Sequence, residues 1–583
     1  MNKINFTTFT CSLLKSPGYR NPGFCLIVLM ACVFSSQHII AQSNTTIQFP
    51  PGARVWNVKD YGATGNGSTD DTQAIQNAIT AALENDNRYD AIRIIYVPNG
   101  TYKISNTLFA KNLNRTDVWD GWRAGFFLQG ESHNRTIIKL ATNALGFWNP
   151  ANPKAMIMTG SESITTSNSG NEAFRHYIRN MTIDVGQGNA GAIGIDFLVS
   201  NRGGIYDVTV KSSDNAGKRG FAGILMDRAW PGPGIIKDVT IDGFEYAMTL
   251  RNNHQQYGMV IEDLTLKDQR TYGIWVQRNT LTIRNLTSTN DVPAIFCGSS
   301  YSHLTVLDGQ LSGGSSSVPA IMTKAATYLR NVNTSGYGFA VDDLSPNNRD
   351  ELNSFVDEYV NRGSFREFAD AIPGAIKLPV KETPGFHTND FSKWQRVDGS
   401  DSDDLAAIQG AIDSSKEIVY LPVGEYRVSN TIVLRGNVKK LVGLCAGIKK
   451  TDDFPSGTPL LRFDGGSQED VIIQFIRLFG DLELNSRKNL VIKNAGVTNK
   501  VYNTSNAKGE FYVEDAIIKK VHLDYPQNSW IRQLNSEFAG EEYFINNGGK
   551  AWMLGYKTEG KSGSLIFNKN GGVVRNVWRF FLC

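Results

Sequence analysis

Cysteine is scarce in this sequence, and its spacing excludes a disulfide-rich scaffold. The 583 residues contain six cysteines; three lie within the first 41 residues, and the others are Cys297, Cys445 and Cys583. Cysteines this far apart do not form the closely spaced framework of small disulfide-bonded domains. We expect Cys297 and Cys445 to fill small apolar spaces in a core.

Histidine and excess charge are also lacking. The chain has seven histidines and a formal net charge of +3, and its first 41 residues hold three lysines or arginines and no acid. Residues 42–583 therefore carry no net formal charge, which leaves no basic surplus for binding nucleic acid. We predict no nucleic-acid partner, no cofactor and no metal. Asp70 and Asp71 are acidic enough to suggest a metal site, but helix capping explains them better.

The one long apolar run lies near the N-terminus, at residues 24–34, after three basic residues. Its length and flanks predict a secretory signal peptide over residues 1–41, cleaved after Ala41. Because the run is too short for a stable membrane span, we expect no membrane insertion after cleavage and a secreted or periplasmic protein. An alternative interpretation takes residues 29–32 as a lipoprotein box, with a lipid anchor at Cys32.

Glycine and short runs of Val, Ile and Thr are abundant, which favours strands joined by turns. Short segments of one type recur every 18 to 31 residues, and most are followed by a second apolar strand: Asn180–Ile183, Asp207–Val210, Asp238–Ile241, Asp263–Leu266, Asn285–Thr287 and His303–Val306. A constant strand with variable loops predicts an all-β, right-handed parallel β-helix. The Asn and Asp residues that head these segments are then ladder residues rather than catalytic ones.

A longer repeat divides the chain. Residues 70–79 return as residues 403–412, and residues 94–107 return as residues 418–431 with the same Pro, Gly and Tyr positions. We therefore predict two tandem right-handed parallel β-helices, each opened by a short amphipathic helix that covers its open end. The boundaries that we predict are residues 50–372 for the first β-helix, 373–390 for a linker and 391–583 for the second β-helix.

The first of these helices should begin at Asp70. Asp70 occupies the N-cap position of the predicted helix, and Gln73 stands at the capping-box position three residues later. A capping box satisfies two of the backbone donors that every helix start leaves unpaired.

Two glutamates in the last part of the chain are candidates for chemistry. Glu537 and Glu559 are 22 residues apart, which is about one coil of a β-helix, so their carboxyl groups should lie on neighbouring coils. Paired carboxyl groups are the usual equipment for breaking a glycosidic bond. The competing interpretation is that Glu559 and Lys557 form a solvated ion pair on the outer face.

Three tryptophans are candidates for contact with sugar rings, which need flat apolar surfaces beside hydrogen-bonding groups. Trp530 and Trp552 flank the glutamates, and Trp230 lies in a loop rich in Pro and Gly. Trp552 alternates with Leu554, so a place in the core is its alternative.

The motifs also carry a family resemblance. Residues 60–71, DYGATGNGSTDD, and the turn VPNGTY at residues 97–102 resemble the β-helix domain of the pectate lyase superfamily. The tandem repeat, together with RQLNSE at residues 532–537 and WMLGYKTEG at residues 552–560, is similar to glycoside hydrolase family 55, whose members pair two β-helices. The resemblance covers nearly all of the chain after the leader.

This resemblance implies an inverting, exo-acting β-1,3-glucanase that acts on a polysaccharide. With its leader, we expect a secreted protein, and we expect a monomer. Carried over to this chain, it implies that Glu559 is the general acid and that Glu537 belongs to the polar network around the attacking water. Gln533 and Asn201 are implied to lie at the substrate, and Asn201 stands where the family has a Gln. The family also continues beyond Gly572, whereas an apolar and basic tail follows here, which we interpret as a shortened C-terminus.

Two other functions compete with this one. A pectin-acting hydrolase or lyase could use the same fold, although no Gly-His-Gly motif of the polygalacturonase type is present among the seven histidines. A non-catalytic glycan-binding β-helix is the other alternative, and retained glucan binding without hydrolysis would identify it.

Overall fold

The structure is a computed structural model. It describes residues 45–84, 93–116, 119–161, 170–215, 217, 219–252, 258–362, 379–400, 402–466, 469–537, 542–559, 565–576 and 580–582, and for Glu559, Asn576 and residues 580–582 it describes the backbone only. The predicted signal peptide over residues 1–41, the alternative anchor Cys32, and Cys583 lie outside the described residues.

Nearly all regular structure is β. In the described part of the chain the strands form sheets of 14, 9 and 18 strands, here named sheet 1, sheet 2 and sheet 3. Sheet 1 contains β1 (Trp56–Asn57), β2 (Asn66–Asp70), β3 (Arg93–Val97), β4 (Gly100–Ile104), β6 (Phe126–Gly130), β7 (Thr136–Leu140), β9 (Tyr177–Asp184), β11 (Gly204–Lys211), β13 (Gly234–Asp242), β15 (Met259–Lys267), β17 (Thr280–Asn290), β19 (His303–Gly313), β21 (Ala326–Ser335) and β23 (Phe355–Val360). Sheet 2 contains β5 (Leu108–Phe109), β8 (Lys154–Met158), β10 (Ala192–Asp196), β12 (Ala222–Leu225), β14 (Tyr246–Leu250), β16 (Tyr272–Val276), β18 (Ile295–Cys297), β20 (Pro319–Thr323) and β22 (Phe339–Asp343).

Sheet 3 is formed by the later strands. It contains β24 (Trp394–Arg396), β25 (Ile418–Leu421), β26 (Glu425–Val428), β27 (Ile432–Leu434), β28 (Lys440–Lys450), β29 (Leu461–Phe463), β30 (Asp470–Phe479), β31 (Leu482–Leu484), β32 (Asn489–Lys493), β33 (Gly496–Asn503), β34 (Phe511–Leu523), β35 (Ser529–Glu537), β36 (Phe544–Asn547), β37 (Lys550–Met553), β38 (Tyr556–Glu559), β39 (Ile566–Lys569), β40 (Val573–Asn576) and β41 (Phe580–Leu582). Its strands pair in parallel, for example β28 with β30 and β35 with β38. We call the strands of sheets 1 and 2 the first stack and those of sheet 3 the second stack.

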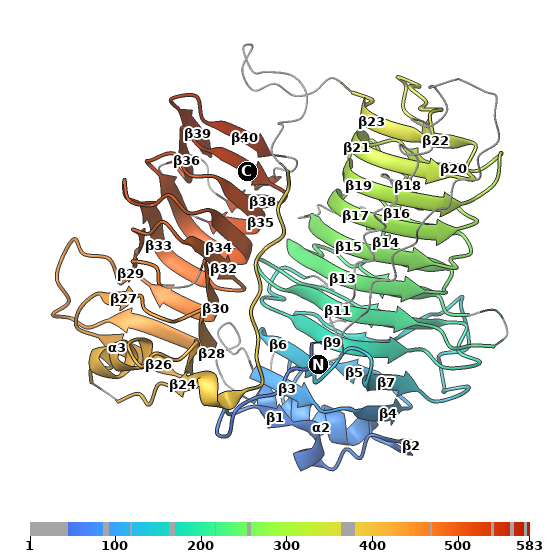
Figure 1. The fold of residues 1–583 in the computed structure, drawn as a ribbon. Coiled ribbons are helices and arrows are strands. Elements are labelled where there is room, and N and C mark those ends of the chain that lie inside the picture. Colours follow the sequence, from blue (N-terminus) through green and yellow to red (C-terminus); the bar gives the residue numbers. More distant parts are fainter. Residues whose placement is uncertain are drawn as a thin grey trace, which may run out of the picture. The chain divides into compact units, whose positions relative to one another are not determined.

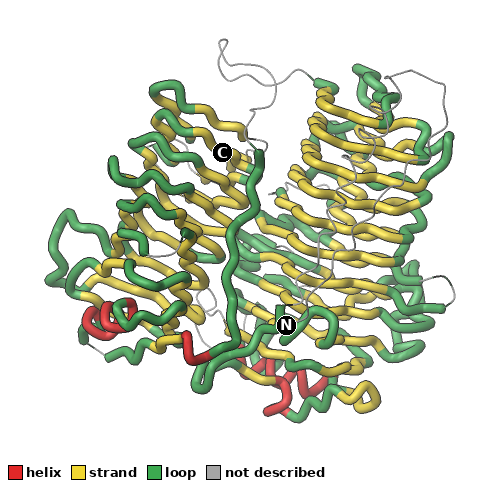
Figure 2. The backbone as a smooth tube through the Cα atoms, viewed as in Figure 1, coloured by secondary structure: helices red, strands yellow, loops and turns green. Residues whose placement is uncertain are grey.

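From β8 to β22, successive strands alternate between sheet 2 and sheet 1, so each coil contributes one strand to each sheet (Figure 1). The coils stack in register, because Thr182, Thr209, Thr240 and Thr265 are direct partners along sheet 1. Figure 2 shows the resulting ladders of short strands joined by loops. The all-β, parallel β-helix prediction is confirmed.

The Asn and Asp residues that head the repeated segments lie at a bend inside each long strand. Asn180, Asp207, Asp238, Asp263 and Asn285 all have a positive φ, between 53° and 57°. Asn and Asp tolerate this left-handed conformation better than other residues with side chains. Asn285 also donates its Nδ2 to Asp263 Oδ1 on the previous coil at 2.8 Å, as a ladder residue does.

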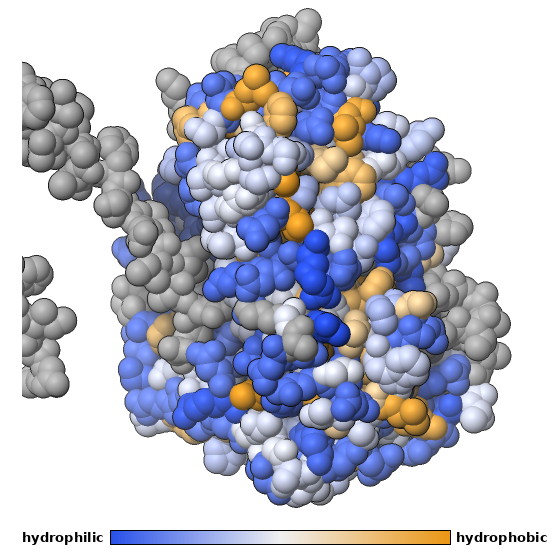
Figure 3. Space-filling view, turned by 90° about the vertical axis from the view of Figure 1, so that its right-hand side faces the viewer, coloured by the Kyte–Doolittle hydropathy of each residue, from blue (hydrophilic) through white to orange (hydrophobic). Residues whose placement is uncertain are grey.

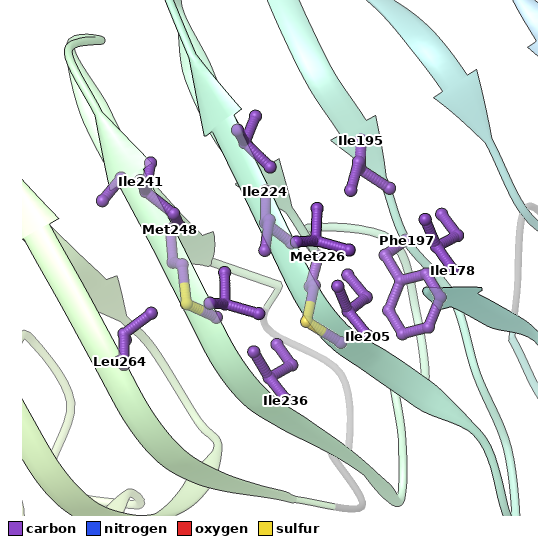
Figure 4. Packing of buried hydrophobic residues seen from close by; sticks show 14 of the residues in the cluster. Ile178, Ile195, Phe197, Ile205, Ile224, Met226, Ile236, Ile241, Met248 and Leu264 are labelled. Atoms are coloured by element: carbon purple, nitrogen blue, oxygen red, sulfur yellow. The ribbon is translucent and has the colours of Figure 1, made fainter. Parts of the chain in front are cut away.

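Inside the first stack, aliphatic side chains from both sheets form one continuous core. Figure 4 shows a section of it, where Met226 and Met248 lie among Ile205, Ile224 and Ile236. Cys297 belongs to this core as a buried free thiol, which confirms its role as a small filler, whereas Cys445 is only partly buried. The second stack has a separate core of the same kind.

The repeated opening sequences take the same structure twice. Helix α2 (Thr72–Ala82) and helix α3 (Leu405–Ile412) follow the two Asp-Asp pairs. Gln76 exchanges two hydrogen bonds with the backbone of Phe109 in the first stack, and Gln409 does the same with Val433 in the second. The long repeat is therefore a repeat of contacts as well as of residues.

The capping prediction is wrong by one residue. Asp71, not Asp70, is the N-cap of α2, and its carboxylate accepts from Thr64 N and Gly65 N instead of from the helix. Asp70 accepts the first helical N–H, that of Thr72, at 3.0 Å, so no capping box with Gln73 forms. Asp403 likewise accepts a hydrogen bond from the backbone N–H of Leu405, the first residue of α3.

The predicted linker is not a free connection. Residues 379–390 form an extended segment, visible in Figure 2 as the long loop that leads into the short helix η2 (Phe391–Lys393). Trp530 Nε1 donates to Pro379 O at 3.1 Å, and Lys440 Nζ donates to Phe386 O at 3.3 Å. Residues 43–583 form one compact unit, so the proposed division at residues 373–390 remains a prediction, as does the right-handed winding of two tandem helices.

An apolar cluster with residues from both stacks joins them. Tyr177, Tyr206 and Val260 of sheet 1 pack with Phe475 and Trp530 of sheet 3 in this cluster, which we call the inter-stack core. The outer face drawn in Figure 3 differs from this buried cluster: hydrophilic residues cover most of it, and hydrophobic ones form small separate patches. Among the described residues, no helix combines the length and the apolar character that a membrane span requires.

Candidate active site

Glu537 and Glu559 are direct partners on neighbouring coils, as their spacing predicts. Strand β35 pairs in parallel with β38, and Glu537 is the Cα partner of Glu559. Neighbouring strands lie about 4.8 Å apart, so the two backbones present their glutamates at adjacent rungs. The side chain of Glu559 lies outside the described part, and its role remains a prediction.

Lys557 points into the protein rather than into solvent. Its side chain is 2% exposed and its Nζ forms an ion pair with Glu537 Oε1, whose side chain is 31% exposed. The alternative of a solvated pair of Lys557 with Glu559 is therefore wrong for Lys557. The reason is that the first stack covers Lys557, and Asn201 Oδ1 of that stack accepts from the same Nζ at 2.8 Å.

Asn535 completes the contacts of Glu537. Its Nδ2 donates to Glu537 Oε1 at 2.8 Å, and it lies two positions earlier on the same strand, so the two side chains share a face. Within the described residues both hydrogen bonds to Glu537 reach Oε1, which leaves Oε2 to accept from a water molecule. Sequence reasoning missed Asn535, although strand alternation from Glu537 would have found it.

The loop that carries Asn201 is tied to the second stack. The backbone N–H of Gly203 donates to Asp515 Oδ1 at 2.8 Å, and the Tyr177 hydroxyl donates to Asp515 Oδ2 at 2.6 Å. Burial raises the pKa of Asp515 above its usual range, although Arg202 and these hydrogen bonds act against the rise. Asp515 was also missed; it stands at the ladder position one coil before Gln533, and both have a positive φ.

Gln533 is a support residue rather than a sugar contact. It is 1% exposed and donates its Nε2 to the backbone oxygen of Asn201 at 3.3 Å. The prediction that Gln533 binds substrate directly is wrong, because the first stack covers it. Asn201 itself is half-buried, with a φ of 61°, and its Oδ1 is held by Lys557.

The prediction of sugar contact is wrong for two of the three tryptophans, because they are buried as Gln533 is. Trp530 and Trp552 are 0% and 1% exposed and belong to the inter-stack core. Trp530 stacks on Tyr512 with ring centroids 5.2 Å apart, and Arg330 lies 5.1 Å from the centroid of Trp552. Trp230 is half-buried in its loop with a φ of 59°, and its part in binding remains a prediction.

The site thus combines a carboxylate, an ammonium and two amides at the junction of the two stacks. Its residues come from the loop after β10 and from strands β35 and β38. Groups of this kind can orient a water molecule and a hydroxyl-rich ligand. Within the described ranges, no group of three or more His, Cys, Asp or Glu residues is placed to hold a metal ion.

Comparison with known proteins agrees with this fold. Residues 55–316 match the family model described as rhamnogalacturonase A/epimerase, pectate lyase-like. This part of the chain is similar to pectate lyase-like β-helix domains. It covers sheet 2 from β5 to β18, and it includes Asn201 but neither glutamate.

This chain aligns with only a small part of the length of each curated relative. A 163-residue stretch, 27% of this chain, is 29% identical to alginate lyase 7 of Azotobacter vinelandii and covers 16% of that protein. A 210-residue stretch, 34% of this chain, is 27% identical to a probable glucan endo-1,3-beta-glucosidase of Arthroderma benhamiae and covers 21% of it. Among solved structures, sacteLam55A from Streptomyces sp. SirexAA-E is 11% identical over 91% of this chain and 85% of that one, with a TM-score of 0.43.

Proposed function

We propose that this protein is a secreted carbohydrate-active enzyme that hydrolyses β-1,3-glucan by an inverting, exo-type mechanism. The observation that carries the proposal is the register of β35 and β38, which makes Glu537 and Glu559 partners on adjacent rungs. The partial match to a probable glucan endo-1,3-beta-glucosidase supports the choice of substrate. The proposed enzyme spans residues 50–583, with residues 50–372 and 391–583 as its two β-helices.

In this mechanism Glu559 is the general acid. It gives its proton to the glycosidic oxygen as the bond between that oxygen and the anomeric carbon breaks. A water molecule attacks the same carbon from the opposite face, and its proton passes to Glu537. Inverting enzymes place their two carboxyl groups about 6.5–9.5 Å apart, which is more than the spacing of adjacent rungs, so the two side chains have to diverge from their backbones.

Lys557, Asn535 and Asn201 act as positioning residues. Lys557 and Asn535 both donate to Oε1 of Glu537, which fixes the direction in which Oε2 points. Lys557 also binds Asn201 of the first stack, so the orientation of Glu537 depends on the contact between the two stacks. An oriented water raises the fraction of bound substrate that is ready to react.

The deciding experiment is hydrolysis of laminarin by the protein without its leader, by Glu559→Gln and by Glu537→Gln. We expect release of glucose with inverted configuration, and loss of at least a thousandfold in kcat for Glu559→Gln. Retained configuration would refute the inverting mechanism, and longer oligosaccharides as first products would refute the exo-type action. Unchanged activity of Glu559→Gln would remove Glu559 from the mechanism.

A uronate polymer is the second candidate substrate, because a stretch of the chain is similar to alginate lyase 7. Alginate and polygalacturonate therefore belong in the same assay. Product with a new double bond, detected by its ultraviolet absorbance, would identify a lyase and displace the glucanase proposal. A folded protein that degrades none of these polymers but binds laminarin would be a non-catalytic glycan-binding β-helix.

A further inference from the structure

A row of aromatic side chains crosses the outer face of sheet 2. Phe221 precedes β12, Tyr246 opens β14, Trp275 lies in β16 and Phe296 in β18, and these strands are neighbours in the sheet (Figure 1). All four side chains are half-buried, whereas the residues that alternate with them, such as Ile274 and Ile295, are in the core. The rings therefore point away from the coil.

Each ring of this row contacts the next. The centroids of Phe221 and Tyr246 are 5.7 Å apart, those of Tyr246 and Trp275 5.4 Å, and those of Trp275 and Phe296 6.0 Å. The planes are tilted by 44° to 75° rather than coplanar. A step of one ring per coil is close to the length of one sugar unit in a linear polysaccharide, and a tilted row suits a chain that turns at each linkage better than a flat ribbon.

The charges beside the row are already neutralised. Arg251 lies over three of the rings, 5.0 Å from the centroid of Trp275, and its Nε donates to Asp227 at 2.8 Å. Arg228 is paired with Asp196 at 2.9 Å in the same region of the sheet. Because these guanidinium groups have carboxylate partners, the face offers hydrogen-bonding groups without net charge. It complements a neutral sugar chain better than a uronate chain.

Two polar residues beside the row follow strands of sheet 2 in the same way as the Asn201 loop does. Asn201 follows β10, Asp227 follows β12 and Arg251 follows β14. The carboxyl ends of parallel strands lie at the same edge of a sheet, so Arg251 and Asp227 stand at the edge that carries the Asn201 loop. A polymer that binds the row and these two residues would extend toward this edge of the sheet.

We propose that the row Phe221, Tyr246, Trp275 and Phe296 is a secondary binding surface for a neutral, turning polysaccharide of the β-1,3-glucan class. Sugar rings pack their C–H faces on the parts of the aromatic rings that Arg251 leaves exposed, and Arg251 and Asp227 bind hydroxyl groups. This inference deepens the proposed function, since it concerns the same class of polymer. The surface binds a long chain and does not take part in the chemistry.

Affinity electrophoresis tests the surface separately from catalysis. Glu559→Gln, which is expected not to degrade the polymer, is run in native gels with laminarin, alone and combined with Trp275→Leu. We expect retardation by laminarin, and about tenfold weaker binding after Trp275→Leu, which keeps an apolar side chain but removes the ring. Tyr525→Ala, an aromatic residue of the second stack that is 41% exposed, is the matched control and should bind as the parent does.

Several results would refute the proposed binding surface. Equal retardation of the Trp275→Leu variant would exclude the aromatic row, and so would a parent protein that laminarin does not retard. Retardation by alginate or polygalacturonate in place of laminarin would refute the neutral ligand. Where Trp275→Leu does not fold, oxidative footprinting of the Glu559→Gln protein replaces it. Laminarin should protect Trp275 but not Trp148, which is 60% exposed, and equal oxidation with and without laminarin would refute the proposal.

The two proposals fail in different ways. Hydrolysis of a laminari-trisaccharide does not need the row, so Trp275→Leu should leave that activity unchanged. Retardation that depends on Trp275 in a protein without any hydrolysis would refute only the proposed enzyme. Hydrolysis of the trisaccharide without retardation would refute only the surface.

Discussion

The backbone N–H of Gly203 donates to the carboxylate of Asp515, 312 positions later in the chain, at 2.8 Å. The same carboxylate accepts from the hydroxyl of Tyr177 at 2.6 Å. These contacts fasten the loop that holds Asn201 to the second stack. The geometry at Glu537 therefore depends on a buried acid of the second stack, one coil before Gln533, that holds a loop of the first stack.

Asp515→Ala should lower activity through this loop. It removes the acceptor of three buried donors, because Asn494 Nδ2 also donates to Asp515 at 2.9 Å. Each donor left unpaired costs about 1–3 kcal/mol. We expect a lower melting temperature and at least a tenfold lower kcat on laminarin, with a smaller change in KM. Asp481→Ala is the matched control, because Asp481 also accepts from the backbone, that of Lys500 at 2.9 Å, but lies away from the loop. Equal loss of kcat in both variants would show a general effect of stability instead.

Lys557→Met tests whether Lys557 orients Glu537 or binds the substrate. Methionine keeps most of the length of the buried side chain but removes the donor to Glu537 and to Asn201. We expect kcat to fall at least tenfold while KM changes little, because the attacking water loses its fixed acceptor. Steady-state kinetics on laminarin give both values. Lys569→Met, at an exposed position of the second stack, should leave both unchanged, and a rise in KM alone for Lys557→Met would point to substrate binding.

The register of the two glutamates could be predicted from the sequence, and the environment of their side chains could not. A spacing of 22 residues equals one coil here, and the repeated segments fixed the coil positions. Strand alternation also separates side chains inside a coil from those outside. It does not tell whether the outside meets water. Trp530, Trp552, Gln533 and Lys557 all face outward from their coil and are covered by the first stack.

The contacts of the linker could not be predicted from the sequence either. Residues 379–390 are polar and rich in Pro, which predicts a free connection. Their backbone oxygens instead accept from buried side chains, such as that of Trp530 at Pro379. The composition of this segment predicts correctly that it forms neither strand nor helix. The side chains that donate to its backbone oxygens lie about 150 positions away in the sequence and leave no local signal.

Trp552→Ala tests the corrected role of this tryptophan. A sugar platform would raise KM with little effect on folding, whereas a residue of the inter-stack core should lower stability. Because Trp552 is 1% exposed, we expect a loss of about 3–5 kcal/mol in the free energy of unfolding. Denaturant titration measures it, and Trp148→Ala is the exposed control, expected within about 0.5 kcal/mol of the parent. An unchanged stability with a raised KM would restore the original prediction.

A buried ion cluster also holds the two stacks together. Glu262 of sheet 1 is fully buried and binds Arg532 of sheet 3 at 2.6 Å, Arg284 at 2.5 Å and Lys237 at 3.4 Å. Burial alone would raise the pKa of Glu262, but the attraction of Arg532, Lys237 and Arg284 lowers it well below its ordinary value. The acid is therefore charged, and three cations depend on it.

Glu262→Gln should destabilise the protein strongly. It leaves buried cations without one of their partners, which costs about 3–5 kcal/mol. Thermal and denaturant unfolding measure the loss. Glu469→Gln is the control: in its ion pair with Lys488 at 2.9 Å the Glu469 side chain is 78% exposed, and surface pairs contribute about 0–1 kcal/mol. Similar small effects of the two substitutions would show that the cluster does not hold the stacks together.

His176 should make the stability fall in mild acid. It is fully buried beside the Asn201 loop, with its Nε2 3.1 Å from the backbone oxygen of Gly160. Burial lowers the pKa of His176 to about 4, the nearby Arg175 and Arg228 add to this, and the bond to Gly160 opposes it. The folded protein thus binds a proton less readily than the unfolded chain, whose histidine has a pKa near 6.5.

The sign of the effect follows from this difference. Above about pH 6.5 the histidine is neutral in both states and its contribution to stability is fully present; between about pH 6.5 and 4 the unfolded chain gains the proton first, and about 3 kcal/mol is lost. His176→Gln keeps a donor for Gly160 but cannot titrate, so its unfolding free energy should fall less than that of the parent across this window. Denaturant titrations at pH 7, 5.5 and 4 give the difference. Parallel curves for the two proteins would mean that His176 does not set the acid sensitivity, because the carboxylates that titrate in the same range are common to both.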